Sequence, residues 1–342
     1  MMQTFQHGGD ITAFAKTCGC SPDEVIDLSS NINFVKPHID VDFNSIDIAP
    51  YPNYNCLYES IADHYGVATE QMELFNGGSA GIFSLFAYIK GNHKGLPLRC
   101  AIYAPAYLEY KKAAEQFGYT LHLIDRFGTM DVEVPQGSLV VFVNPATPDG
   151  VFYDIQPLLE KWHNRNYTVL IDESFIEFTP HTSATGYLAQ YPNLFILKSL
   201  TKYWGAAGIR MGALLSSAQN IAALRQTEPL WKLSAFDTTY IQAVLQDKTF
   251  AVRSETANQE SRDYLLALLQ QSPLIKHIYP SEANFVLVEL QGITAEELQE
   301  RLTPYRVMVR NCENFDGLGK YHVRIALKEV EKLQRLKEVF HA

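Results

Sequence analysis

Short apolar runs alternate with amphipathic stretches through the middle of the chain. The runs are rich in β-branched and aromatic residues and predict buried strands at residues 99–105, 139–145, 167–173, 194–199 and 211–217. Each run is almost continuously apolar, which is typical of parallel strands covered on both faces. Helix-like stretches lie between them, for example at 108–118 and 155–166. This alternation predicts an α/β fold with a mostly parallel sheet and right-handed crossovers.

The pattern changes after about residue 240. A long helical stretch at 255–272 is followed by apolar runs that predict strands at 283–290, 305–311 and 321–327. A helical pattern at 295–302 and a charged amphipathic stretch at the end of the chain complete this part. We therefore expect three parts: an N-terminal arm at 1–45, a large domain at 46–240 and a small α+β domain at 241–342.

Composition and charge narrow the possible functions. Hydrophobic residues make up 47% of the 342-residue chain and charged residues 19%, the balance of a globular protein with a sizeable core. The net charge of −10, without a basic stripe, excludes a nucleic-acid partner. No apolar stretch is long enough to span a membrane, and the N-terminus lacks the features of a signal peptide. Five scattered cysteines favour reduced thiols and no metal site, so we expect a cytoplasmic protein.

Polar side chains follow the predicted strands at the points where the strands end. The carboxyl ends of parallel strands meet at one edge of a sheet, and ligands of such sheets bind there. The residues expected at this edge are Tyr107, Asn144, Thr147, Asp172, Glu173, Ser199 and Lys202. Their convergence is the first sign of a functional site.

Each feature of this site also has a simpler explanation when it is taken alone. Gly77, Gly78 and Ser79 precede an apolar helical stretch, where free N–H groups favour a phosphate, but glycines also mark ordinary turns. Asp172 could pair with a protonated ring nitrogen or cap the next helix. Lys202 could be a nucleophile or a surface lysine.

Taken together, these residues resemble the fold-type I pyridoxal-phosphate (PLP) enzymes over essentially the whole chain. The resemblance implies that Lys202, in "SLTK", is bonded to the cofactor and that Asp172 keeps the ring nitrogen protonated. It implies that Tyr107 stacks on the ring. The residues that it assigns to the cofactor phosphate are Gly78, Ser79, Ser199, Arg210 and, from the neighbouring subunit of a homodimer, Tyr51.

One position departs from the family pattern. The family's "NPNNPTG" segment is "NPATPDG" here, so Thr147 stands where an asparagine donates a hydrogen bond to the ring hydroxyl. Asn144 lies three residues earlier. A threonine hydroxyl can donate the same bond with shorter reach. We expect both residues among those that bind the cofactor.

The ends of the chain indicate the substrate. "HGGDI", "IDLSSNINF" and "VRNCENFDGLGKYHVRIAL" resemble the threonine-phosphate decarboxylases of cobalamin biosynthesis, and next the histidinol-phosphate aminotransferases. The resemblance implies that Arg324 binds the substrate α-carboxylate and that His7, Asn31 and Arg310 lie near the substrate. It implies decarboxylation of L-threonine O-3-phosphate or L-serine O-phosphate, with amino transfer as the alternative, since both reactions use the same catalytic residues.

Simpler explanations remain open for these substrate residues. Arg310 could be a surface arginine, His7 a polar residue of the arm, and the "NIN" segment a turn. A binding protein without turnover would also keep the cofactor residues.

Overall fold

The computed structural model describes residues 9–92 and 97–341, and its contacts divide the chain into two compact units. The small unit consists of the chain up to Val35, Ala146–Phe152 and the chain from Ala251 onward. The large unit consists of Lys36–Pro145 and Tyr153–Phe250. The domain boundaries expected at residues 45 and 240 stay a prediction.

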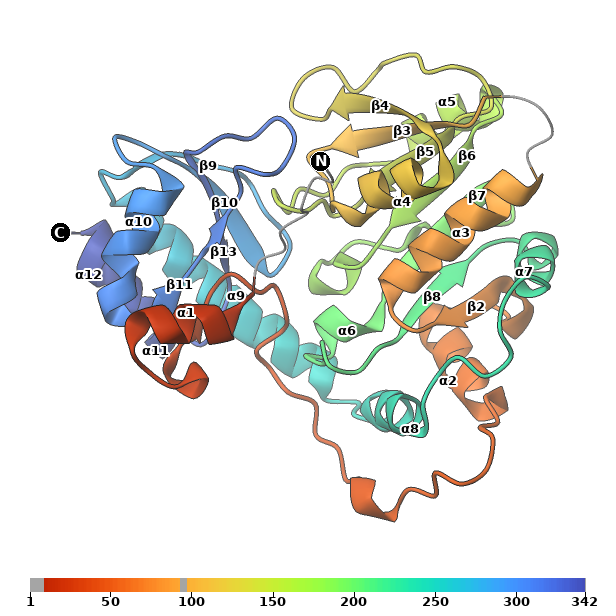
Figure 1. Ribbon diagram of the computed structural model, residues 1–342, viewed down its shortest axis with the longest axis horizontal. Helices are drawn as coiled ribbons and strands as arrows, with labels where there is room; N and C mark the ends of the chain where they lie inside the picture. Colours follow the sequence, from red (N-terminus) through yellow and green to blue (C-terminus); the bar gives the residue numbers. More distant parts are fainter. Residues whose placement is uncertain (1–8, 93–96, 342) are drawn as a thin grey trace. The chain divides into compact units, whose positions relative to one another are not determined.

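The large unit is built on a seven-stranded sheet in the order β2-β8-β7-β6-β5-β3-β4 (Figure 1). The strands are β2 (Met72–Phe75), β3 (Arg99–Ala104), β4 (Thr120–Asp125), β5 (Leu139–Val143), β6 (Thr168–Asp172), β7 (Leu194–Ser199) and β8 (Gly212–Leu215). β3 to β7 are mutually parallel, which confirms the mostly parallel α/β sheet. The run at 211–217 was expected to be parallel too, but β8 is antiparallel to both of its neighbours.

Helices cover both faces of this sheet. α3 (Gly78–Asn92) and α4 (Glu109–Phe117) pack together on the face that carries Ile102, Val141 and Leu170. Successive residues of a strand point to opposite faces. Tyr103 and Phe142 therefore point to the other face, where their rings meet Trp162 of α5 (Gln156–Asn164) at 5.7 and 5.6 Å.

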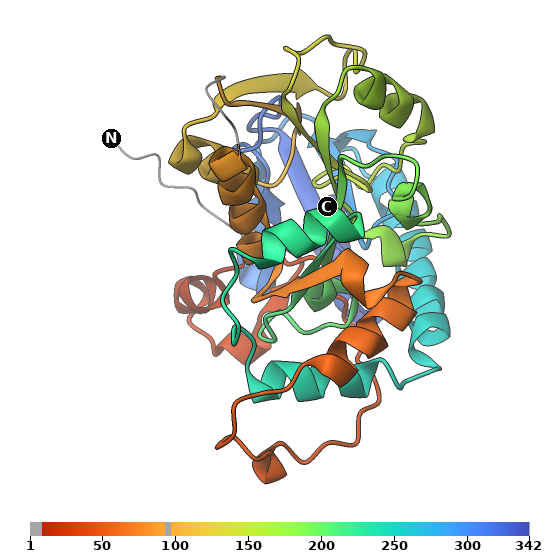
Figure 2. The ribbon, with the colours of Figure 1, turned by 90° about the vertical axis from the view of Figure 1, so that its right-hand side faces the viewer.

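Four more helices belong to the large unit. They are α2 (Asn55–Tyr65), α6 (Leu200–Tyr203), α7 (Ala218–Arg225) and α8 (Ala235–Val244). α2 and α8 lie side by side in both views (Figure 1 and Figure 2). α6 is a single turn that follows β7 directly and carries Lys202.

The small unit has a four-stranded antiparallel sheet in the order β12-β13-β10-β9 and a separate parallel pair, β1 with β11. The strands are β1 (Ile26–Asp27), β9 (Ile275–Ile278), β10 (Phe285–Leu290), β11 (Val307–Met308), β12 (Arg310–Asn311) and β13 (His322–Ala326). The run at 305–311 is thus two strands. Val307 and Met308 pair with the N-terminal segment, whereas Arg310 pairs with β13.

Five helices belong to the described part of the small unit, and all except α1 contribute side chains to a shared apolar core. They are α1 (Ile11–Cys18), α9 (Phe250–Gln270, whose first residue belongs to the large unit), α10 (Ala295–Leu302), α11 (Val330–Leu333) and α12 (Lys337–Phe340). Leu28, Leu269, Ile325 and Phe340 are among its fully buried members. The N-terminal segment therefore contributes to this core through Leu28. Within the described residues, no helix combines the length and the apolar character that a membrane crossing requires.

Candidate active site

The neighbouring strands β7, β6, β5 and β3 all point the same way, so the loops that follow them meet at one edge of the sheet. Tyr107 follows β3, Asn144 follows β5, Asp172 ends β6 and Ser199 ends β7. This arrangement confirms the expected parallel order of the four strands that carry these residues.

Asp172 is a buried carboxylate that three hydrogen bonds hold in place. Tyr110 donates its hydroxyl to Oδ2 at 2.6 Å. The backbone N–H and the hydroxyl of Ser174 donate to Oδ1 at 2.9 and 2.5 Å. Burial, first, and the negative charge of Asp172, second, raise the pKa of Tyr110 well above its ordinary value, so Tyr110 remains a donor. These three donors fix the carboxyl group in place, in an arrangement suited to a cationic partner.

A cradle without side chains lies at the start of α3. Gly77 has a φ of +84°, and a Cβ there would lie 2.5 Å from Arg210 Nη2. A Cβ on Gly212 of β8 would lie 2.6 Å from the backbone N of Gly78. The first N–H groups of a helix have no partner within it and favour an anion. Arg210 adds a cation, and its backbone N–H donates to the buried Asp237 at 2.9 Å.

Lys202 stands on the turn after β7, beside the hydroxyl of Ser199. Its Nζ lies 3.4 Å from Ser199 Oγ, which in turn lies 3.1 Å from Thr201 Oγ1. The Lys202 ammonium also lies 5.4 Å from the centre of the Phe175 ring. A primary amine beside a hydroxyl and an aromatic face can act as a nucleophile or carry a proton.

Tyr107 connects the cradle to the carboxylate. Its hydroxyl lies 3.3 Å from Ser79 Oγ, and its ring meets that of Tyr110 edge-on at 6.2 Å. Burial raises the pKa of Tyr107; the charge of Asp172 raises it further and that of Arg210 lowers it. Tyr107 thus contacts Ser79 at the start of α3 on one side and Tyr110, which donates to Asp172, on the other.

Two predicted residues have other contacts in the large unit. The Asn144 side chain donates to Tyr153 O at 3.0 Å and accepts from Tyr153 N at 2.9 Å, so it closes the loop between them. Tyr51 is 76% exposed, and its ring stacks on the half-exposed Trp231 at 4.2 Å. The expected roles of both residues toward the cofactor stay predictions.

The small unit contains a buried arginine with neutral partners. Arg324 is 7% exposed; Nη1 donates to Thr147 Oγ1 at 3.0 Å and Nη2 to Ser29 O at 2.8 Å. Among the described residues, Arg324 Nε is buried without a hydrogen-bond partner. Burial is the main cause that lowers the pKa of Arg324 to about 10. The guanidinium remains charged at neutral pH, and a buried cation of this kind suits an anionic ligand.

Arg310 lies directly opposite Arg324 on the neighbouring strand. Its guanidinium donates to Asn314 Oδ1 at 2.8 Å and lies 5.3 Å from the Phe315 ring. No ion pair with a carboxylate is recorded for either arginine in the described part of the chain. Asn31 lies in the same unit, where its backbone oxygen accepts from Asn284 at 3.0 Å. His7 lies outside the described residues.

Comparison with known proteins identifies the family. The Aminotransferase class I and II family model matches residues 24–340. The chain belongs to this aminotransferase family. Its cofactor is PLP.

Individual relatives divide between two activities. Threonine-phosphate decarboxylase of Salmonella typhimurium is 28% identical over 96% of this chain and 94% of its own length. Histidinol-phosphate aminotransferase of Methanothermobacter thermautotrophicus is 26% identical over 99% and 94%. The Leptospira interrogans bifunctional protein CobDQ is also 28% identical, but the chain spans only 40% of it. The histidinol-phosphate aminotransferase structure from Clostridium acetobutylicum has a TM-score of 0.80 at 27% identity, covering 93% of this chain and 99% of that one.

The residues of the large unit fit PLP. The glycine cradle with Arg210 suits its phosphate, the fixed carboxylate of Asp172 suits a protonated ring nitrogen, and the amine of Lys202 suits the aldehyde. The cradle is the firmest part of the fit, because a side chain at Gly77 would overlap the Arg210 guanidinium and one at Gly212 would overlap the backbone of Gly77 and Gly78.

Several residues of the site were not foreseen from the sequence. They are Tyr110, Ser174, Phe175, Thr201 and Asp237. Ser174 had a local signal, because an Asp two residues before a Ser commonly bonds to its backbone and hydroxyl. Asp237 had none, since it lies 27 positions from Arg210 in the chain.

The cradle predicts the effect of Gly212→Ala. The new methyl group meets backbone atoms of Gly77 and Gly78, which cannot rotate away, so the start of α3 must move. We expect the dissociation constant for PLP to rise by up to about 100-fold, measured by absorbance titration of the apoprotein. Gly208→Ala is the matched control, because nothing lies within 4 Å of its Cβ position. Equal affinities in the two variants would contradict this account.

A second prediction concerns the attachment of the cofactor to Lys202. The purified protein should be yellow, and borohydride should attach the cofactor permanently to the peptide that contains Lys202. Lys202→Ala should show no label by mass spectrometry, whereas Lys232→Ala, which removes a lysine bound to Glu73 and Glu228, should be labelled like the wild type. Label retained at full level in Lys202→Ala would remove Lys202 from its proposed role.

Proposed function

We propose that the chain removes the α-carboxylate of L-threonine O-3-phosphate or L-serine O-phosphate and releases the amino-alcohol phosphate. The observation that carries the proposal is the pair of arginines on β12 and β13. Two neighbouring guanidiniums without a carboxylate partner among the described residues suit a substrate with two anionic groups. The relatives named threonine-phosphate decarboxylase support this choice.

In this proposal each arginine holds one end of the substrate. Arg324 binds the carboxylate through Nε and its remaining N–H groups, which form a fork that matches two oxygens. Arg310, with Asn31 and His7, binds the phosphate. Since Thr147 accepts from Arg324, its own hydroxyl hydrogen remains available to donate, in line with the expected bond to the ring hydroxyl.

When bound, PLP supplies a ring that withdraws the electron pair of a bond broken at the substrate α-carbon. Asp172 keeps the ring nitrogen protonated through its fixed negative charge. Tyr107 packs against the ring face and limits its tilt. Lys202 returns a proton to the α-carbon after the carboxylate has left. The choice of bond rests with the arginines, because they orient the anionic groups.

Amino transfer is the second candidate. The structural match to a histidinol-phosphate aminotransferase, at 27% identity, favours it specifically. Such an enzyme would use Lys202 to move the proton of the α-carbon itself, with the carboxylate retained on Arg324. Both reactions use Lys202, Asp172 and Tyr107, so the way in which the substrate is bound decides between them.

The deciding experiment is an assay with two sets of substrates. With O-phosphothreonine and O-phosphoserine we expect CO2 and no keto acid. With histidinol phosphate and 2-oxoglutarate we expect no amino transfer. Arg310→Ala should remove about 2–4 kcal/mol of transition-state binding, measured as a lower kcat/KM for the phosphorylated substrate. The affinity for PLP should remain nearly unchanged. Rapid amino transfer without CO2 release would establish the second candidate instead.

We also propose that the enzyme works as a homodimer, as its family typically does. The exposed stack of Tyr51 on Trp231, beside the 77% exposed Leu230, is an apolar surface suited to a second copy. Tyr51 would then reach the cofactor phosphate of the neighbouring subunit.

The dimer predicts a mass of two chains in sedimentation equilibrium. Trp231→Glu should shift the species to one chain, because a charge replaces a buried contact in the dimer. Leu123→Glu, at an equally apolar exposed site on the edge strand β4, should leave the dimer intact. Tyr51→Phe should weaken PLP binding and keep the dimer. A wild-type protein that is monomeric and fully active would refute the proposal.

A further inference from the structure

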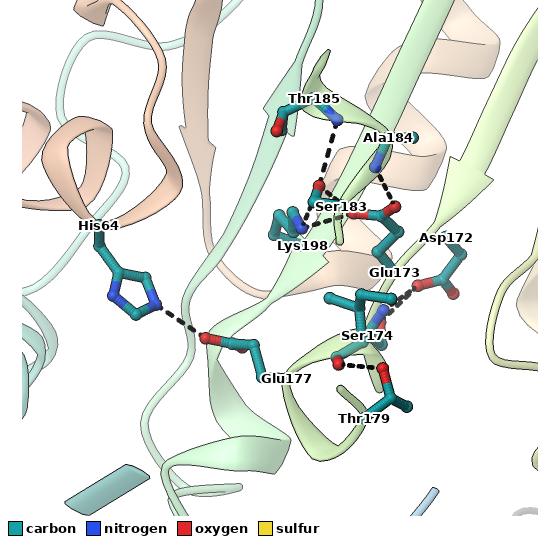
Figure 3. A network of polar contacts seen from close by, with 11 residues as sticks. His64, Asp172, Glu173, Ser174, Glu177, Thr179, Ser183, Ala184, Thr185 and Lys198 are labelled. Atoms are coloured by element: carbon teal, nitrogen blue, oxygen red, sulfur yellow. Dashed lines mark hydrogen bonds and ion pairs between the residues drawn. The ribbon is translucent and has the colours of Figure 1, made fainter. Parts of the chain in front are cut away.

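A buried ion pair lies behind the cofactor residues of the large unit. Glu173 and Lys198 are 2% and 1% exposed, and Lys198 Nζ lies 2.5 Å from Glu173 Oε2. Ser183 donates to the same oxygen at 2.5 Å and accepts from Lys198 at 2.9 Å. The N–H of Ala184 donates to Glu173 Oε1 at 2.7 Å. Figure 3 shows Lys198, Ser183 and Ala184 converging on Glu173, beside Asp172 and Ser174.

This pair needs an explanation, because burying two charges is costly. Apolar residues of similar size often serve stability as well as a buried ion pair does, or better. Neither residue has a role in the chemistry described above. Their neighbours in the chain do: Glu173 follows Asp172, and Lys198 precedes Ser199.

The pair joins two of the strands that carry cofactor residues, β6 and β7. β6 and β7 are parallel, Asp172 is in register with Leu197, and Glu173 N donates to Leu197 O at 2.9 Å. Because side chains alternate along a strand, Asp172 and Ser199 point to one face of the sheet, and Glu173 and Lys198 point to the other. The ion pair therefore ties the two strand ends together from the face opposite the cofactor residues.

Glu173 also closes the loop that supports Asp172. Its carboxylate binds Ser183 and Ala184 at the far end of this loop. At the near end, Ser174 donates both of its hydrogen bonds to Asp172, and Phe175 lies beside the Lys202 ammonium. A shift of Glu173 would move Ser174 and Phe175, and with them the carboxylate of Asp172.

We propose that Glu173 and Lys198 are positioning residues: their ion pair holds the ends of β6 and β7 and the loop 173–184 so that Asp172 meets the ring nitrogen of the cofactor. Neither residue touches the cofactor. The pair acts on binding and on the protonated state of the ring, whichever bond of the substrate is broken. This positioning role is the same for decarboxylation and for amino transfer.

The test compares PLP with deazapyridoxal 5′-phosphate, in which a carbon replaces the ring nitrogen. Asp172 can bind the protonated nitrogen of PLP but has no such partner in the analogue. The ratio of the two dissociation constants, measured by absorbance titration of the apoproteins, therefore reports the placement of Asp172. A residue that only stabilises the fold would change both constants in parallel and leave the ratio unchanged.

Glu173→Gln should reduce the preference for PLP by about 10- to 100-fold, the size of effect that loss of an outer hydrogen-bond partner has at metal ligands. The matched control is Glu73→Gln. Glu73 is also a buried carboxylate, 3% exposed, and it binds Arg225 and Lys232 at 2.7 Å each. This control should lower the free energy of unfolding in urea and keep the wild-type ratio.

The double variant Glu173→Gln, Lys198→Met separates positioning from folding. It leaves no unpaired charge, so it should fold even where a single variant does not. We expect urea stability near that of the wild type together with the reduced preference for PLP. A double variant with the wild-type ratio would overturn the proposal, as would a Glu173→Gln ratio equal to that of Glu73→Gln.

Discussion

Four neighbouring strands that run in the same direction determine where the chemistry of this chain takes place. β3, β5, β6 and β7 are hydrogen-bonded in a row, and each ends at the same edge of the sheet. Residues separated by up to a hundred positions therefore meet without a long loop to carry them. The strands are buried on both faces, which makes the platform rigid. A cofactor that must be held at three points needs such a platform, since a small shift at any point weakens binding.

Two kinds of partner satisfy the buried charges of this chain. In the large unit, Asp172 accepts from hydroxyls and Glu173 pairs with Lys198. In the small unit Arg324 binds only neutral oxygens of the protein. Its pKa is lower in the folded chain than in the unfolded chain, so its burial opposes folding below about pH 10 and does so less as the pH rises further. An anionic ligand offsets that cost and gains affinity from it.

Much of this arrangement follows from local sequence. The apolar runs placed β3, β5, β6 and β7 because strands buried on both faces need such runs, and the polar residues after them marked the edge. The direction of β8 did not follow, because an apolar run has the same pattern in either direction. Its antiparallel course is visible only from its neighbours β2 and β7. The division of 305–311 into β11 and β12 likewise depends on two different partner strands.

The side-chain partners of the site were less accessible from the sequence. Asp172 was recognised by its place after a strand, but the bond from Tyr110 spans 62 positions. The contact of Arg324 with Thr147 spans 177 positions. Such contacts arise from tertiary packing, and no local pattern encodes them. Asn144 also has contacts that no pattern indicated: its amide braces the backbone of Tyr153, and its contact with the cofactor stays a prediction.

The alternation along β6 and β7 has a consequence for how this protein can change over time. Each strand end presents a chemical residue to one face and a supporting residue to the other, in adjacent positions. Deleting or inserting a single residue in either strand would turn every side chain beyond that point to the opposite face. Glu173 would then stand where Asp172 belongs, or Lys198 where Ser199 belongs. Single substitutions in these strands are therefore compatible with the site, whereas the insertion or deletion of one residue is not.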